Sequence, residues 1–182
     1  MRKHITSRNA AFFAAGGFAA ALFLGGAAHA ITDTVFKYSR PQIGYTMIPA
    51  SAFVPQSSSA TYTNLGYWIG FAGGACFTAA VNNLPQGAKF TALAFWYDKN
   101  DTDAVTIELA RMQMSNHDIG TIALAHAGDT TGQYVGANVK IADASLQTVD
   151  NGHYLYFINQ CMSSTEHFWG ARVAFTYTTA GN

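Results

Sequence analysis

The feature that most constrains the fold of this 182-residue chain is an alternation of apolar and polar side chains near its C-terminus. Residues 168–177 place apolar side chains at every second position. Residues 153–160 place Leu155 and Phe157 on one face of a strand and Tyr154, Tyr156 and Ile158 on the other. A period of two is what a β-strand needs when one of its faces packs on a core. Both stretches are therefore predicted strands. In the second, the side chains expected inside are Trp169, Ala171, Val173, Phe175 and Tyr177, with Arg172 and Thr176 outside.

The rest of the chain carries further short apolar runs separated by turn residues. Examples are the runs at 75–81 and 119–127, which end at Asn82-Asn83 and Gly128-Asp129. No window shows a helical stripe of ten or more residues. We expect about eight or nine antiparallel strands, which form an all-β, two-sheet sandwich of the jelly-roll type.

The stretch 89–97 departs from simple alternation. Phe90 and Trp96 have one parity, whereas Leu93 and Phe95 have the other. A strand that is apolar on both parities is buried on both faces, or is buried on one face and makes a contact with the other. The sequence leaves both alternatives open.

The first thirty residues have the three zones of a secretory signal peptide. Arg2, Lys3 and Arg8 form a basic start, residues 10–26 are uncharged and apolar, and Ala28-His29-Ala30 supplies the small residues that signal peptidase reads. The apolar run is shorter than the roughly 20 residues of a membrane span, which disfavours an uncleaved anchor. We expect residues 1–30 to be removed. The mature chain is then secreted or periplasmic in a bacterial-type cell, without membrane insertion.

Residues 31–182 have a length that suits a single mature domain. Residues 31–64 are expected to be irregular, because prolines interrupt them, with a possible first strand at 43–48. The β-sandwich is expected to span residues 65–182.

Two cysteines, Cys76 and Cys161, follow the signal peptide. Export places them where disulfides form and persist, so we predict that they are bonded to each other. The alternative is a pair of separate buried thiols. Two isolated cysteines are at most half of a zinc-ligand set, and no cofactor motif is present, so neither a metal nor a cofactor is predicted.

The charge of the chain argues against a nucleic-acid partner. Ten Lys and Arg residues, less Arg2, Lys3 and Arg8, leave seven after residue 30, against ten Asp and Glu residues. Phosphate backbones are bound by clustered Lys and Arg, so no nucleic-acid partner is expected. The partner classes that remain are a second copy of the chain, a glycan or another protein.

An acidic loop is the best candidate for a metal site. Asp98, Asn100, Thr102 and Asp103 supply oxygen atoms of the kind that calcium prefers. The glycine and the distal glutamate of an EF-hand are missing, however, and Asp and Asn favour turns through local hydrogen bonds. A solvated hairpin turn is the favoured interpretation, and a calcium site is the weaker alternative.

No motif for catalysis is present. His117, His126, His153 and His167 are scattered, and the chain lacks a G-x-S-x-G motif. Ordinary surface or strand histidines are the favoured interpretation. A catalytic pair formed by residues distant in sequence stays open, because a sequence contains no distances.

Three tryptophans, Trp68, Trp96 and Trp169, lie among many Tyr and Phe residues. Aromatic rings on the outside of a sandwich can stack on sugars or anchor a partner, whereas rings on the inside fill the core. Core packing is the favoured interpretation, above all for Trp169, because its neighbours alternate.

Three stretches together resemble a known group of sequences. They are 48–55 (IPASAFVP), 84–98, which begins with LPQGA and ends with Tyr97-Asp98, and 168–173 (FWGARV). Their pattern resembles that of uncharacterised secreted bacterial β-sandwich proteins, "IPAAxFxP … LPxGAxVxxLxxxYxD … LYGVRVxY". The resemblance implies the fold and export, and it carries no catalytic residue.

The function predicted from these observations is a secreted structural or interaction domain without catalytic activity. The first alternative is a carbohydrate-binding module, and the second is a hydrolase-type enzyme with a site built from loops. An exposed row of aromatic rings would favour sugar binding, and a flat apolar patch would favour assembly. A pocket with converging His and carboxylate groups would favour catalysis.

The zones of the N-terminus predict cleavage after Ala30. N-terminal sequencing of exported protein should therefore begin at Ile31. Exported protein that begins at Met1 would refute this prediction.

Overall fold

The structure is a computed structural model that describes residues 36–71, 73–99, 105–127, 132–162 and 167–180. All of these residues belong to one compact unit. The expected signal peptide lies outside them. Within the described ranges, no helix has the length and apolar character needed to cross a membrane.

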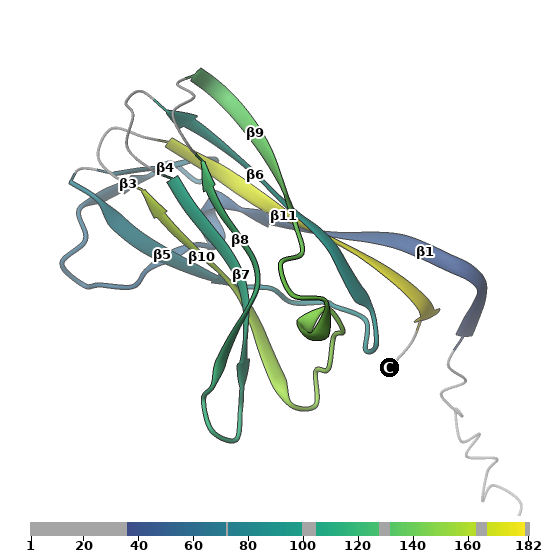
Figure 1. Cartoon of the computed structure of the whole chain (residues 1–182). Helices are drawn as coiled ribbons and strands as arrows, with labels where there is room; N and C mark the ends of the chain where they lie inside the picture. Colours follow the sequence, from purple (N-terminus) through teal and green to yellow (C-terminus); the bar gives the residue numbers. More distant parts are fainter. Residues whose placement is uncertain (1–35, 72, 100–104, 128–131, 163–166, 181–182) are drawn as a thin grey trace, which may run out of the picture. The chain divides into compact units, whose positions relative to one another are not determined.

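The described residues form two antiparallel sheets, so the predicted all-β sandwich is confirmed (Figure 1). Within the described ranges, three strands of two or three residues accompany eight longer ones, and two short 3-10 turns, η1 (Ala50–Ala52) and η2 (Ala144–Leu146), connect strands. Sheet A contains β1 (Phe36–Pro49), β3 (Tyr62–Asn64), β4 (Ile69–Phe71), β6 (Lys89–Lys99), β9 (Gly132–Lys140) and β11 (His167–Ala180). Sheet B contains β2 (Val54–Pro55), β5 (Ala75–Ala80), β7 (Val105–Gln113), β8 (Ile119–Ala127) and β10 (Tyr154–Met162).

The order of pairing is that of a jelly roll. Strand β4 pairs with β11, β5 with β10, β6 with β9 and β7 with β8, as in one long hairpin. Further pairs between β6 and β11 and between β7 and β10 roll this hairpin into two sheets. The predicted jelly-roll topology is therefore present.

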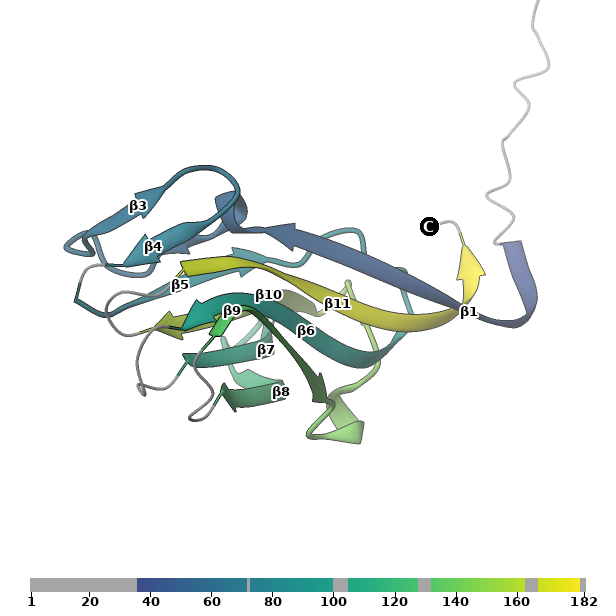
Figure 2. The same ribbon diagram turned by 90° about the horizontal axis from the view of Figure 1, so that it is seen from above.

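Strand β1 is longer than the strand expected at 43–48. It pairs with β11 from Pro49 opposite Gly170 to Phe36 opposite Ala180. Because the pairing of β11 with β6 ends at Thr176, β1 and the end of β11 continue together as a two-stranded ribbon (Figures 1 and 2). Within the described residues β1 pairs with β11 alone. The prolines that made this segment look irregular are tolerated there, because an edge strand does not need every backbone N–H donor for pairing.

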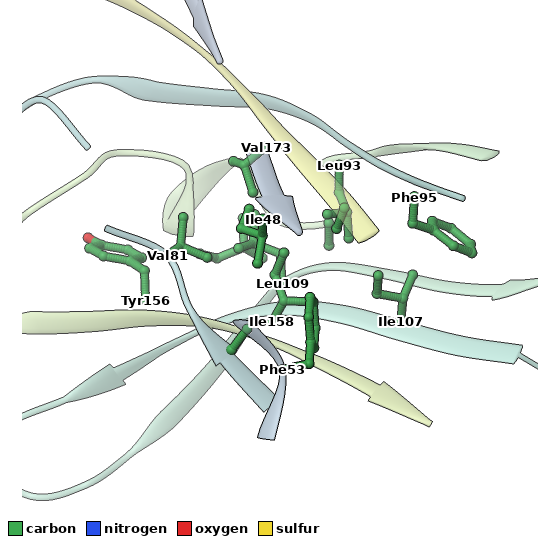
Figure 3. Close-up of a cluster of buried hydrophobic side chains, with 14 of the residues drawn as sticks. Ile48, Phe53, Val81, Leu93, Phe95, Ile107, Leu109, Tyr156, Ile158 and Val173 are labelled. Atoms are coloured by element: carbon green, nitrogen blue, oxygen red, sulfur yellow. The ribbon is translucent and has the colours of Figure 1, made fainter. Parts of the chain in front are cut away.

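The core lies between the two sheets, as Figure 3 shows. The predicted alternation in β11 holds for Ala171, Val173 and Phe175, which are all buried. They face side chains of sheet B such as Ile107 and Ile158, which are fully buried. Burial of these apolar side chains is the main stabilising contribution to the sandwich. Other labelled members of the cluster are Ile48, Phe53, Val81, Leu93, Phe95, Leu109 and Tyr156.

A β-bulge explains the mixed pattern of 89–97. Ala174 pairs with Ala92 but Phe175 pairs with Phe90, so β6 has one extra residue at this point. The bulge returns Phe90 to the core side, where it is fully buried. β6 therefore buries its inner face against the core, and Trp96 lies on the other face, where it is partly buried.

A second register break corrects the prediction for Trp169. Phe168 pairs with Tyr97 and Gly170 pairs with Trp96, which leaves Trp169 without a residue opposite it in β6. Of these two aromatic residues, Phe168 is therefore fully buried and Trp169 is not. Trp169 is half-buried, so its assignment to the core was wrong.

The predicted disulfide is present. Cys76 and Cys161 lie directly opposite each other in β5 and β10, with their Cα atoms 4.1 Å apart. The bond closes a segment of 85 residues and joins two neighbouring strands of sheet B. It therefore constrains the unfolded chain over more than half of the sandwich.

Removing the disulfide with the double substitution Cys76→Ala and Cys161→Ala should lower the free energy of unfolding by about 2–4 kcal/mol, because the unfolded chain regains loop entropy. Urea unfolding of the variant and of the oxidised native protein measures this difference. The native protein under reducing conditions is the matched control and should unfold like the variant. Equal midpoints for all three samples would contradict the prediction.

Candidate functional site

The outer face of sheet A, which is the side directed away from sheet B, carries a row of aromatic rings. Because side chains alternate along a strand, the residues between the buried ones of β1, β6 and β11 point to this face. None of the five rings concerned is buried in the core. They are Tyr45, Tyr67, Trp68, Trp96 and Trp169, and we call them the aromatic row.

One end of the aromatic row is a cluster around β4 and the start of β11. The Trp68 ring lies 4.1 Å from the His167 ring, and the Tyr67 ring lies 5.8 Å from that of Trp169. A Cβ atom on Gly70 would come within 2.5 Å of the Trp68 ring. The glycine therefore lets the indole lie directly on β4, while Tyr67 remains 60% exposed.

His167 also contacts a carboxylate. Its Nδ1 lies 3.3 Å from Oδ2 of Asp98, and the side chain of His167 is 37% exposed whereas that of Asp98 is 9% exposed. The two residues are opposite each other in the pairing of β11 with β6. This contact holds the imidazole in place beneath Trp68, so the ring cluster is preorganised.

The other end of the aromatic row is built around Arg172. Its guanidinium carbon lies 4.9 Å from the centre of the Tyr45 ring and 5.6 Å from that of Trp96. Its Nε atom is buried and has no hydrogen-bond partner. Cation–π contact orders such a guanidinium without neutralising its charge.

The two clusters lie on one continuous surface. Along β11, His167 and Ala174 mark its ends, since Ala174 is opposite Tyr45. Seven residues of strand correspond to about 23 Å. On β1 the surface ends in a stripe of exposed apolar side chains, because Ile43 and Met47 flank Tyr45 and are 65% and 63% exposed. We call Ile43, Tyr45 and Met47 the β1 stripe.

Sheet B presents a different outer face. An open hollow of about 570 Å³ lies at the end of β5 and the start of β10. The side chains that line it include Met112, Leu155, Phe157, Asn82, Asn83 and Asn151. None of the residues that line it is charged.

A row of polar side chains crosses sheet B next to the hollow. Gln56 donates a hydrogen bond to Asn159, which in turn donates one to Glu108, and both are 3.0 Å long. Thr121 donates another to Glu108. These groups satisfy one another, so they are less available to a ligand than the guanidinium of Arg172.

The structure places the predicted histidines apart from one another. His153 forms a 2.7 Å contact with Asp150 in an exposed turn, and this hydrogen bond holds the pKa of the Asp150 carboxyl below its ordinary value. His126 contacts Thr106, and His117 lies in a turn with a positive φ. No histidine lines the hollow on sheet B.

The candidate calcium loop falls mostly outside the described residues. Asn100, Thr102 and Asp103 are not part of them. Asp98 is described, and its carboxylate faces His167. Within the described ranges, no group of three or more His, Cys, Asp or Glu residues is arranged to hold a metal ion.

Sequence reasoning named the three tryptophans but assigned them to the core, and it did not identify Tyr45, Tyr67 or Arg172 as members of a site. The two-sided apolar pattern of 89–97 was the available signal, since it allowed a contact on the outer face. The positions of the bulges, which decide the parity of Trp96 and Trp169, depend on pairing with β11.

Comparison with solved structures finds similar folds at low identity. The C-terminal carbohydrate-binding module CBM6 of LamC, a marine laminarinase from Zobellia galactanivorans, has a TM-score of 0.48 and 12% identity, and the match covers 71% of this chain and 98% of that one. The xylan-binding module CBM15 has a TM-score of 0.45 and 12% identity, over 76% of this chain and 100% of that one. A chain of infectious bursal disease virus, Gx strain, has a TM-score of 0.38 and 10% identity, over 78% and 33%.

These similarities are too distant to indicate what this chain binds. No protein-family model matches the sequence, and no curated protein matches it significantly.

Proposed function

We propose that this chain is a secreted glycan-binding domain and that the outer face of sheet A is its binding surface. The observation that carries the proposal is the aromatic row, which lies on a sheet face outside the core. Exposing large rings to water is unfavourable, and such rings are ordinarily placed where they will be covered. A surface of about 23 Å along β11 is long enough for an extended chain molecule.

The chemistry of the row suits sugar rings. Trp and Tyr combine a flat apolar face, which packs on the C–H groups of a sugar, with a polar atom at the ring edge. His167, Asp98 and Arg172 place hydrogen-bonding groups between the rings. The rings are attached to paired strands, so little conformational entropy is lost when a ligand binds.

Assembly through the β1 stripe is a second candidate function. Ile43, Tyr45 and Met47 are all more than half exposed and lie on a strand whose pairing, within the described residues, is with β11 alone. A long apolar edge strand is a site at which another chain can add a strand. Pro41 and a register break between Lys37 and Gln42 interrupt the strand, which limits such addition to the part that carries the stripe.

A hydrolase-type site has less support than either binding function. The two contacts between histidine and carboxylate, His153 with Asp150 and His167 with Asp98, lie in different parts of the sandwich. Neither contact belongs to the hollow on sheet B.

If the aromatic row binds glycans, Tyr67→Ala and Trp68→Ala should each weaken binding by roughly tenfold, because a lost ring contact is worth about 1–2 kcal/mol. Affinity electrophoresis on a panel of soluble polysaccharides finds a ligand, and calorimetry then measures the dissociation constants. Leu155→Ala, on the outer face of sheet B and 51% exposed, is the control and should bind like the native protein. Failure of the native protein to bind any polysaccharide, or unchanged binding by both variants, would refute the proposal.

The assembly alternative predicts a different result. The native protein should then sediment as an oligomer, and Ile43→Lys combined with Met47→Lys should sediment as a monomer, because two charges would be buried in the contact. Leu124→Lys, at an exposed position of β8, is the control. A native protein that is monomeric at high concentration would rule out this alternative.

A further inference from the structure

We infer that the outer face of sheet A selects acidic glycans, that is, polysaccharides whose sugar rings carry carboxylate or sulfate groups. This inference rests on the proposed glycan binding and adds the class of ligand. Two independent observations support it: the distribution of charge between the sheets, and the surroundings of Arg172.

Positive charge is concentrated in sheet A. All seven Lys and Arg residues after position 30 lie in strands, and one of them, Arg111, lies in sheet B. The six others lie in strands of sheet A: Lys37 and Arg40 in β1, Lys89 and Lys99 in β6, Lys140 in β9 and Arg172 in β11.

Among the described residues, negative charge is distributed in the opposite way. Five Asp and Glu residues belong to the described part of the chain, and Asp98 is the one that lies in a strand of sheet A. Its side chain is almost buried and faces His167. Glu108 lies in sheet B, and Asp118, Asp143 and Asp150 lie in connections. Among the described residues, the strands of sheet A therefore carry six cations against one almost buried carboxylate.

Three of the cations share the outer face with the aromatic row. Arg172 is opposite Ala94, Lys140 is opposite Ala92, and Lys89 is opposite Thr176. Both lysines are exposed. Because successive outward positions on a strand are about 7 Å apart, these charges form a short series along the face. A polymer with acidic groups at intervals could contact several of them at once.

Arg172 lacks a hydrogen-bond partner that an acidic ligand would supply. Its guanidinium is held between Tyr45 and Trp96, and its Nε is buried without a hydrogen-bond partner. A buried N–H donor without a partner is costly. A planar guanidinium stacked on rings matches a carboxylate or sulfate in geometry and charge. An acidic sugar that stacks on Trp96 or Tyr45 would bring such a group to Arg172.

The test compares the native protein with three variants on three probes: polygalacturonate, which carries carboxylates, dextran sulfate, which carries sulfates, and dextran, which is neutral. Arg172→Gln removes the central charge, and Arg172→Lys keeps the charge but loses the planar fork. Arg111→Gln is the matched control, because Arg111 also stacks on an aromatic ring, 4.1 Å from the centre of Tyr154, but lies in sheet B. Calorimetry at low salt and at about 0.5 M NaCl measures affinity and its screening.

We expect the native protein to bind at least one acidic probe about tenfold or more tightly than dextran, with the preference lost in high salt, since exposed charges are screened. Arg172→Gln should lose most of the preference, Arg172→Lys should retain part of it, and Arg111→Gln should behave like the native protein. The relative affinities for the two acidic probes decide between carboxylate and sulfate. If Arg172→Gln does not fold, as judged by thermal unfolding, Lys89→Gln combined with Lys140→Gln tests the same charges at exposed positions.

The results separate this inference from the proposed function. Equal, salt-independent binding of dextran and the acidic probes would overturn the acidic preference and leave glycan binding intact. A preference that survives in Arg172→Gln and in the lysine variant would also overturn it. If the native protein binds none of these or other polysaccharides, the proposed function fails, and the inference fails with it.

Discussion

Strand β11 is hydrogen-bonded along both edges, to β6 on one side and to β4 and then β1 on the other. Its inner side chains, among them Phe168 and Val173, are fully buried against sheet B. Its outer side chains include His167 and Arg172, around which the two ends of the aromatic row are built. The same pairing that closes the core therefore also sets the spacing of the candidate site. A rigid central strand is a suitable base for a surface that must hold its side chains in place without a ligand.

Sheet B contains the disulfide and a polar side chain in the core. The disulfide joins β5 to β10 at Cys76 and Cys161, next to Gln160, whose side chain is fully buried and whose amide atoms have no hydrogen-bond partner. Leaving a buried amide unpaired costs about 1–3 kcal/mol, which the disulfide can offset by constraining the unfolded chain. The polar row through Glu108 is satisfied internally, and the hollow beside it is uncharged.

The two faces of the sandwich thus differ in chemistry. Sheet A combines aromatic rings with most of the positive charge of the chain, and sheet B combines an uncharged hollow with a closed hydrogen-bond network. Aromatic rings alone would fit glycan binding or association with another chain, and the β1 stripe fits the latter. The cations distinguish the alternatives, because a second copy of the chain would place like charges against one another at the same face. An acidic polymer suits both the aromatic rings and the positive charge of this face. It would contact the rings and Arg172.

The sequence alone determined the class of fold and much of the core. Alternation in residues 168–177, the apolar run at 153–160, and turn residues between short apolar runs predicted antiparallel strands, because successive side chains of a strand point to opposite faces. Two cysteines after a predicted signal peptide predicted one disulfide. The parity of Trp96 and Trp169, by contrast, depended on bulges in the pairing of β6 with β11, since one extra residue moves every following side chain to the other face. The extent of β1 depended on its partner strand, and the site depended on residues from four strands and a loop. Tyr45, Trp96 and Arg172 come together only through the pairing of their strands. The register of that pairing decides which distant residues are in contact, and no local sequence pattern predicts it.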